Sequence, residues 1–319
     1  MSLGPGTSEL TPTLADPPRM PARVETVRRQ FDRRVERFRA HDALVREVGR
    51  RLIERLDYVK LAPHRIADIG CGTGGARAAL LARYPQAVWI GIDLSLPMLR
   101  AAAPRAGLLA RWLRPPREFR VCAEAGTLPF ADATIDLAFS NLMLHWHPAP
   151  HTVFPEWKRV LRTDGLLMFS CFGPDTGKQL RAACAAALPD VRPLPFVDMH
   201  DFGDMMVAAG FATPVMDVEV LTLTYASPRA LLREVAALGG NPRDDRRTAL
   251  VSTRQAHALF DALEAQRGAD GRIALSFEVA YGHAWKPQPR VPGETSIPLD
   301  RLRAGLAART RPATRDAGV

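Results

Sequence analysis

A cluster of glycines directly follows a short apolar segment in residues 66–75, IADIGCGTGG. Three of these glycines occupy alternate positions, at Gly70, Gly72 and Gly74. Glycine is needed where a backbone must turn sharply and let a ligand come close, so the pattern indicates a ligand-binding turn. Gly75 complicates this interpretation, because it also completes the Gly-x-Gly-x-x-Gly fingerprint of dinucleotide sites.

Carboxylates near the turn indicate which cofactor it binds. Asp68 stands two residues before the first glycine. A pyrophosphate is held by backbone N–H groups and has little use for a carboxylate there, whereas the ammonium group of S-adenosylmethionine (SAM) needs one. Asp93, in GIDLS, is placed to accept hydrogen bonds from the ribose of either cofactor. Asp68 and the EAGTLPF stretch at 124–130 therefore favour SAM over a nicotinamide dinucleotide.

Two histidines and a tryptophan follow an apolar run in SNLMLHWHP, residues 140–148. A metal site needs three or four converging donors, and His145 and His147 supply two at most, with His151 just beyond. Residues two apart do not share a helix face, so the two histidines should point to different places. We therefore predict no metal site, and we interpret Trp146 as a packing residue and His145 as a candidate donor lining the site.

Composition excludes several classes of protein. Of the 319 residues, 47% are hydrophobic, and no apolar run approaches the length of a membrane span. The four cysteines lie far apart with no Cys-x-x-Cys pair, which argues against a disulfide scaffold and is typical of a reducing, cytoplasmic setting. The net charge is +9, from 43 basic residues of which only four are lysines. Such a charge suits an acidic partner, and it is equally compatible with a compositional bias toward arginine.

Alternating strands and helices must position these residues. Apolar residues at helical spacing predict one or two helices over 24–57. Strands are then expected at 65–69, 88–92, 119–122, 135–139, 166–172, 215–225 and 273–282. Helices are expected between them, at 76–84, 96–103, 142–146, 151–161, 199–210, 228–238 and 252–267. This alternation predicts an α/β fold with a mostly parallel sheet covered on both faces.

As a set, the motifs closely resemble class I SAM-dependent methyltransferases. The matching pieces are D-x-G-x-G-x-G, an acidic end to the second strand, EAGTLPF and IDLAFSN, within residues 65–172. The resemblance implies a Rossmann-like, doubly wound sheet of seven strands with SAM as the cofactor. A protein that keeps this fold but has lost its cofactor is the alternative.

The resemblance also implies roles for particular residues. The methionine end of SAM would be lined by Asp68, Gly70, Cys71, Gly72 and Gly74. Asp93 would hold the ribose, and Leu94 would flank the adenine. Glu124, where the family usually has Asp, would meet the adenine edge together with Ala125, and Asn141 would close the site.

Over about residues 28–287, the order of segments resembles the malonyl-acyl-carrier-protein O-methyltransferase family of biotin synthesis. In that family a helical insertion between the last two strands roofs the active site. Gly240-Asn241, Arg246 or Arg247, and the closing GHAWKP also resemble the related complex I assembly factors, a group associated with arginine hydroxylation. The expected organisation is a disordered leader (1–23), a helical cap (24–64), a SAM-binding core (65–225), a helical lid insertion (226–270), a final core strand (271–287) and a tail (288–319) with a short helix near Leu302.

The resemblance implies O-methylation of the free carboxylate of malonyl-acyl carrier protein. A carboxylate is already an anion and needs no general base, which agrees with a chain that has no obvious nucleophile–base pair. An arginine should grip the carboxylate, and His145 and Tyr225 are candidate acceptor-site residues. An acidic carrier suits a basic enzyme.

Other classes of function stay open at this point. One is an assembly-factor-like SAM-binding protein of the arginine hydroxylase type. Another is a methyltransferase that acts on a different small molecule or on a protein. Nucleic acid is not expected as a partner, because no binding module is visible and SNLML is not the N/D-P-P-Y/F segment common in base N-methylation.

Overall fold

The computed structural model describes residues 22–103, 117–245 and 251–289. The chain divides into two compact units, residues 1–287 and residues 288–319, and all but two of the described residues belong to the first. Several sequence predictions lie outside the described residues: the leader up to residue 21, the arginines Arg246 and Arg247, and the tail helix near Leu302.

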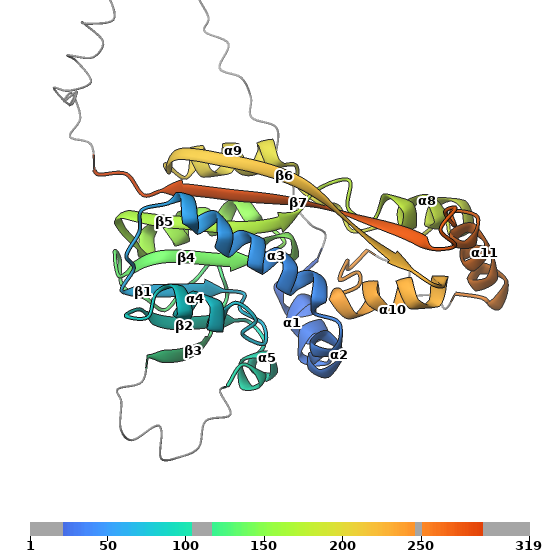
Figure 1. Ribbon diagram of the computed structural model, residues 1–319, viewed down its shortest axis with the longest axis horizontal. Coiled ribbons are helices and arrows are strands. Elements are labelled where there is room, and N and C mark those ends of the chain that lie inside the picture. Colours follow the sequence, from blue (N-terminus) through green and yellow to red (C-terminus); the bar gives the residue numbers. More distant parts are fainter. Residues whose placement is uncertain (1–21, 104–116, 246–250, 290–319) are drawn as a thin grey trace, which may run out of the picture. The chain divides into compact units, whose positions relative to one another are not determined.

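Seven strands form one sheet in the order β3-β2-β1-β4-β5-β7-β6 (Figure 1). Strands β1 to β5 are parallel to their neighbours in this part of the sheet, whereas β7 runs antiparallel to both β5 and β6. The strands are β1 (Arg65–Ile69), β2 (Val88–Asp93), β3 (Glu118–Cys122), β4 (Ile135–Asn141), β5 (Leu161–Phe172), β6 (Ala212–Tyr225) and β7 (Ile273–Trp285). The prediction of a doubly wound, mostly parallel sheet of seven strands is confirmed.

Helices connect most of the strands, and in the described part of the chain three further α-helices precede the first strand. The α-helices are α1 (Val24–Asp32), α2 (Val35–Ala40), α3 (Ala43–Glu54), α4 (Arg77–Arg83), α5 (Leu96–Ala101), α7 (Val153–Val160), α8 (Lys178–Ala187), α9 (Met199–Ala208), α10 (Pro228–Leu238) and α11 (Thr253–Glu264). Short 3₁₀ turns are η1 (Arg55–Tyr58), η2 (Leu144–Trp146) and η3 (Pro150–Thr152). Among the described residues, no helix is both long enough and apolar enough to cross a membrane.

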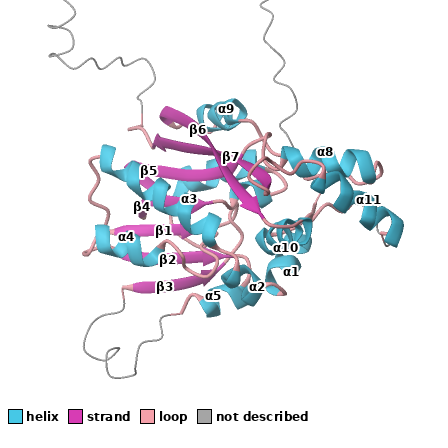
Figure 2. Ribbon diagram, turned by 45° about the vertical axis from the view of Figure 1, so that its right-hand side comes forward, coloured by secondary structure: helices cyan, strands magenta, loops and turns pink. Residues whose placement is uncertain are grey.

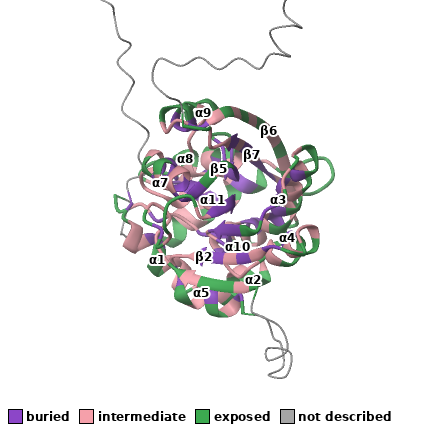
Figure 3. Cartoon of the chain, turned by 90° about the vertical axis from the view of Figure 1, so that its left-hand side faces the viewer, coloured by how far each residue is buried: buried purple, intermediate pink, exposed green. Residues whose placement is uncertain are grey.

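Apolar side chains cover both faces of the sheet, as is typical of parallel strands. One core cluster includes buried residues of α3 and α4, and the other includes buried residues of α7 and α9. Strand β4 alternates between them, with Leu137 and Phe139 in the first cluster and Ala138 in the second. Figure 3 shows buried residues on the inner strands of the sheet, whereas β6 and the outward sides of the helices are intermediate or exposed.

The structure departs from the predicted elements in several places. Residues 24–57 form three α-helices and the start of a 3₁₀ turn rather than one or two helices, and the helix expected at 142–146 is a 3₁₀ turn over Leu144–Trp146. Strand β5 begins at Leu161, whereas the sequence predicts its start at residue 166. Its first residues, LRTDG, are mostly polar and carry no apolar signal, although Leu161 pairs with Ile135. Helix α8 is not predicted at all, because its alanine-rich sequence KQLRAACAAA has little apolar periodicity and Ala183 is its only buried residue.

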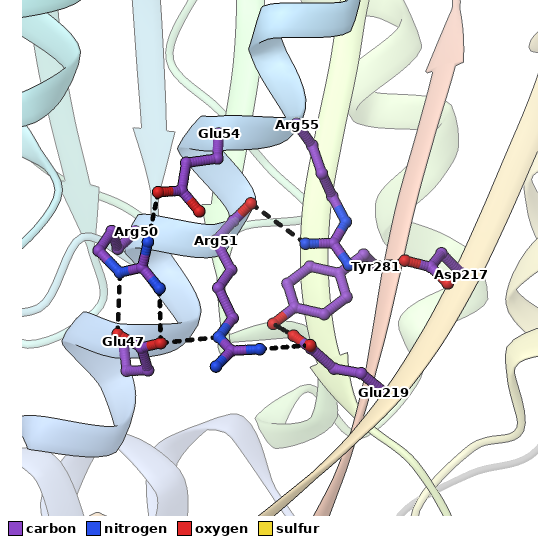
Figure 4. A network of polar contacts seen from close by, with 8 residues as sticks. All are labelled: Glu47, Arg50, Arg51, Glu54, Arg55, Asp217, Glu219 and Tyr281. Carbon is purple, nitrogen blue, oxygen red and sulfur yellow. Dashed lines mark hydrogen bonds and ion pairs between the residues drawn. The ribbon is translucent and has the colours of Figure 1, made fainter.

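A polar network fastens α3 to the antiparallel edge of the sheet (Figure 4). Arg51 of α3 donates to Glu219 of β6 over 2.6 Å, and the Tyr281 hydroxyl of β7 donates to the same carboxylate. Arg55, one turn further on, lies 3.6 Å over the Tyr281 ring and pairs with Asp217 at 2.6 Å. The network therefore joins the N-terminal helices to the two strands that end the fold.

Candidate cofactor and acceptor site

The carboxyl ends of β1, β2 and β4 face a cavity of about 840 Å³. Figure 2 shows these strand ends directed toward α1, α2 and α10. Strand β1 lies between β2 and β4, so this edge is the switch point at which open α/β sheets bind ligands. Helices α1, α2 and α3 supply an apolar part of the wall, made by Val24, Val27, Phe31, Phe38, Val45 and Ile53.

The turn after β1 requires glycine at the three alternate positions. The φ angles of Gly70, Gly72 and Gly74 are 75°, 55° and 77°, in the left-handed region that other residues rarely adopt. A Cβ atom at Gly70 would also lie 2.2 Å from the side chain of Met143. Gly75 does not have a positive φ angle, and a Cβ atom added there would meet no other atom within 4 Å. The backbone therefore needs the Gly-x-Gly-x-Gly pattern, and Gly75 is not one of its conformational requirements.

Asp68 is a buried carboxylate in the cavity wall, with 2% of its surface exposed. Its Oδ2 accepts a hydrogen bond from the Trp89 indole over 3.1 Å, and no described cation pairs with it. Burial raises the pKa of Asp68 from 3.8 to about 7, against the Trp89 hydrogen bond and with help from repulsion by Asp93. The site therefore holds a carboxylate that lacks a positive partner.

Asp93 closes the cofactor turn at the end of β2. Its two carboxylate oxygens accept hydrogen bonds from the backbone N–H groups of Gly72 and Ser95, each over 2.8 Å. Burial raises the pKa of Asp93 to about 6, in spite of these hydrogen bonds. Each oxygen of a carboxylate has two acceptor positions, so both oxygens retain capacity for hydroxyl donors.

Glu124 is held in place by His147, for which the sequence alone predicts no role. His147 Nε2 lies 2.9 Å from Glu124 Oε1, and the Ala149 N–H donates to His147 Nδ1 over 3.1 Å. The Gly126 N–H donates to the other oxygen of Glu124 over 2.9 Å. Burial acts to raise the pKa of Glu124, but the hydrogen bonds from His147 and Gly126 outweigh it, and the pKa is lowered. Glu124 is therefore an ionised, fixed acceptor.

Asn141 lines the cavity, but its polar atoms are engaged within the protein. Its Nδ2 donates to the Val45 carbonyl of α3 over 2.9 Å, and its Oδ1 accepts from the Ser170 hydroxyl over 2.8 Å. A Cβ atom at Gly49 would lie 3.0 Å from the same Nδ2. Asn141 therefore connects β4 to α3.

The two histidines of SNLMLHWHP diverge, as predicted. His147 contacts Glu124, whereas His145 is 4% exposed and packs against the Phe172 ring at a centroid distance of 4.6 Å. Within the described part of the chain, no group of three potential metal-binding side chains is present. Trp146 packs edge-on against Phe31 of α1, with ring centroids 5.4 Å apart.

The cavity brings most of the predicted site residues together. Its wall contains Asp68, Gly70, Cys71, Gly72, Asp93, Leu94, Glu124, Ala125, Asn141 and His145. Gly74 and Tyr225 are not part of the wall. Sequence reasoning missed three supporting residues, Trp89, Met143 and His147, because their roles depend on contacts with residues distant in the chain.

The insertion between β6 and β7 contributes less to the cavity than the sequence predicts. Among its described residues, only Leu238 of α10 lines the wall. The buried residues of α11, Leu259 and Leu263, belong to a core cluster, and α11 packs against α8. The apolar cover therefore comes mainly from α1, α2 and α3.

The residues at the strand ends fit SAM. The Asp68 carboxylate has no described cationic partner, so it can pair with the ammonium group of SAM. The Asp93 carboxylate can accept further hydrogen bonds, from the ribose hydroxyls. Leu94, Met98 and Ala125 give the neighbouring wall an apolar surface suited to an adenine ring. A dinucleotide would leave the Asp68 carboxylate buried without a cationic partner.

Comparison with known proteins agrees with this geometry. A family model described as a methyltransferase domain matches residues 67–169. The YcgJ protein from Bacillus subtilis has a similar fold, with a TM-score of 0.53, 16% identity, and coverage of 76% of this chain and 99% of that one. A putative methyltransferase from Bacillus halodurans is similar, with a TM-score of 0.52, 17% identity, and coverage of 74% and 99%. At these identities the likeness shows the fold alone.

Curated relatives match over most of the chain. The malonyl-[acyl-carrier protein] O-methyltransferase of Methylovorus sp. (strain MP688) is 44% identical over 269 residues, which cover 83% of this chain and 90% of that protein. The protein of the same name from Gallionella capsiferriformans is 41% identical over 268 residues, covering 84% and 92%.

The fold, the glycine turn and the family match define an enzyme, a class I SAM-dependent methyltransferase. Within that class, the chain belongs to the malonyl-[acyl-carrier protein] O-methyltransferase family.

Proposed function

We propose that this enzyme methylates the free carboxylate of a malonyl group carried by acyl carrier protein, in the cytoplasm and as a step of biotin synthesis. The observation that carries the proposal is the similarity to curated relatives of that name, at 35–44% identity over most of the chain. The proposal includes the cofactor roles expected for Asp68, Asp93 and Glu124.

The side chains in the cavity suit an acceptor that is already an anion. When bound, SAM supplies an electrophilic methyl group, and its transfer to a carboxylate oxygen forms an ester bond as the carbon–sulfur bond breaks, with no proton to remove. His147 is engaged with Glu124, and burial lowers the pKa of His145 to about 3, so neither residue is placed to act as a base. The protein's part is to orient the carboxylate and exclude water.

Helices α1 to α3 offer both the apolar cover and the cations that such an acceptor needs. Four arginines also line the cavity: Arg28, Arg39, Arg46 and Arg50. Each pairs with an acidic residue three or four positions away on its own segment, in contacts of 2.7–3.8 Å. Exposed pairs of this kind are weak, so an incoming carboxylate or phosphate can take over one of these guanidinium groups.

Ties between the N-terminal helices and the β6–β7 insertion help to exclude water from the acceptor. Ring nitrogen Nδ1 of His41 lies 2.7 Å from Glu234 of α10, and Thr26 of α1 donates to Asp244 over 3.1 Å. Gln30 donates to the Asn241 carbonyl over 3.2 Å. We propose that residues 24–64 and the described residues of 226–270 act together as the cap through which the acyl chain enters.

Transfer of a labelled methyl group from SAM tests the proposal. Label should appear on malonyl-carrier protein as a base-labile ester, and it should be absent from unacylated and acetyl-carrier protein. A protein that binds SAM at low salt and leaves malonyl-carrier protein unlabelled would contradict the proposal and favour the assembly-factor type of function.

A further inference from the structure

One buried polar atom of the cavity wall has no partner. His145 Nε2 is inaccessible to water and forms no hydrogen bond with any described residue. Tyr225 also has such an atom, but this residue does not belong to the cavity wall. An unsatisfied buried donor costs about 1–3 kcal/mol, so its retention needs an explanation.

The surroundings of His145 determine where its proton lies. The Phe172 N–H donates to Nδ1 over 3.4 Å, and the Cys171 thiol lies 3.7 Å from the same atom. Burial raises the pKa of the Cys171 thiol, so the sulfur keeps its proton and is a second donor facing Nδ1. Since both neighbours are donors, Nδ1 must accept, and the ring proton resides on Nε2.

The ring is also kept neutral. It contacts the rings of Trp146, Phe172 and Phe196 at centroid distances of 4.9, 4.6 and 5.8 Å, and no described acidic side chain pairs with it. Burial lowers the pKa of His145 to about 3, so the ring is uncharged near neutral pH. A residue of the cavity wall therefore carries a fixed, uncharged N–H group that has no partner among the described residues.

We propose that His145 Nε2–H donates a hydrogen bond to an oxygen of the malonyl group and thereby positions the acceptor. The inference rests on the proposed function. In the proposed arrangement Asp68, Asp93 and Glu124 accept from the ammonium, ribose and adenine donors of SAM. The competing acceptor for the His145 N–H group is the methionine carboxylate of the cofactor, which S-adenosylhomocysteine also carries, so the binding of that compound separates the two. Trp146 and Phe172, whose rings contact His145, line the cavity together with Leu238, and these apolar side chains suit an acyl chain.

Variants that keep or remove the donor test this role. In His145→Gln the side-chain amide places an N–H group near the original Nε2 position, whereas His145→Phe keeps a ring of similar shape and removes the donor. His145→Phe should lower kcat/KM for malonyl-carrier protein by about 10- to 100-fold, the effect of losing one hydrogen bond to a charged group. His145→Gln should recover most of this loss. Both variants should bind S-adenosylhomocysteine as the wild type does, which shows that they fold and that the residues that bind the cofactor are undisturbed.

The control is His200→Phe, which changes an exposed histidine of α9 that does not line the cavity and should leave kcat/KM unchanged. Inhibition by acetyl-carrier protein, which has the thioester carbonyl but no free carboxylate, shows which oxygen of the malonyl group accepts the hydrogen bond. If His145→Phe weakens the binding of malonyl-carrier but not acetyl-carrier protein, the partner is the carboxylate, and if it weakens both, the partner is the thioester carbonyl. Equal kcat/KM in wild type and His145→Phe would overturn this inference alone, whereas an inactive wild type would overturn the proposed function and the inference with it.

Discussion

Asp68 and Asp93 end neighbouring strands, and burial changes the acid–base behaviour of both in the same direction. Their pKa values are raised to about 7 and about 6, so the folded protein holds protons that the unfolded chain has already lost. Between pH 3.8 and about 7, Asp68 binds more protons in the folded state than in the unfolded state, because its folded-state pKa is raised. Over that range the free energy of unfolding therefore falls as the pH rises. A cation bound beside the ionised Asp68 carboxylate would restore the free energy of unfolding that is lost.

Affinity for the cofactor should therefore depend on pH through Asp68. The dissociation constant of S-adenosylhomocysteine should fall as the pH rises toward 7 and level off above it, because the ammonium group pairs with the ionised carboxylate. Asp68→Asn should weaken binding about 10- to 100-fold at pH 8 and flatten this dependence, since a charge-assisted hydrogen bond is lost. Isothermal calorimetry across this range provides the measurement, and an equally steep pH dependence in the variant would remove Asp68 from the cofactor site.

Asp93→Ala should weaken SAM binding at least about tenfold without unfolding the chain. The carboxylate would lose hydrogen bonds to the ribose, each worth on the order of 1.5–3 kcal/mol, and the N–H groups of Gly72 and Ser95 would lose their acceptor. Asp204→Ala is the matched control, because Asp204 is exposed on α9 and does not line the cavity. Unchanged affinity in a folded Asp93→Ala protein would contradict the proposed ribose contact.

Helix α3 is the element on which the cavity most depends. One side is fastened to β6 and β7 by Arg51 and its neighbours, and the Val45 carbonyl accepts from Asn141 of β4. These contacts leave little freedom for α3 to shift, so the position of the cavity wall follows the position of the sheet. Close approach of Asn141 also explains why a glycine, Gly49, occupies the interior of this helix.

Two helical glycines should respond oppositely to alanine. Gly203→Ala in α9 should stabilise the protein by up to about 1 kcal/mol, because its Cβ would lie 3.9 Å from the nearest atom and alanine favours a helix. Gly49→Ala should destabilise it by about 1 kcal/mol, because the new Cβ displaces Asn141 from the Val45 carbonyl and leaves buried polar groups unpaired. Urea denaturation gives both values, and stabilisation by Gly49→Ala would show that Asn141 is not tightly held.

The whole molecule carries a net charge of +9, which should speed encounter with an acidic carrier. Raising the salt concentration should therefore lower kcat/KM for malonyl-carrier protein steeply, since surface charges are screened over about 10 Å at 0.1 M. Malonyl-pantetheine, which lacks the acidic protein, should show little salt dependence. Equal dependence for the two substrates would argue that the net charge plays no part in docking.

At saturating SAM, the activity should stay nearly constant from about pH 6.5 to 8.5, because a malonyl carboxylate is ionised throughout that range. The proposed mechanism removes no proton, and the lowered pKa of His145 keeps this residue neutral there. At limiting SAM the rate should fall toward the acid side as Asp68 gains its proton. A rate that rises tenfold per pH unit at saturating SAM would indicate a general base.

Local patterns in the sequence were sufficient for the succession of strands along the chain, the mostly parallel sheet and the glycine turn. Alternating apolar segments and glycines act through the backbone of their own neighbourhood, so they can be recognised without knowing what lies across the fold. The same reasoning placed Asp68 inside the first strand and Asp93 at the end of the second, and the structure has these two strands side by side. It missed α8, whose sequence lacks a periodic apolar face.

Only the tertiary structure decided how the site is enclosed and which polar atoms remain free. Asn141 pairs with a carbonyl 96 positions away, and this contact depends on how α3 lies on the sheet. The tautomer of His145 follows from donors on β5, and α11 stays out of the cavity wall because it packs on α8. Such contacts join segments distant in the chain, so their partners are set by strand register and packing, which no local pattern of residues encodes.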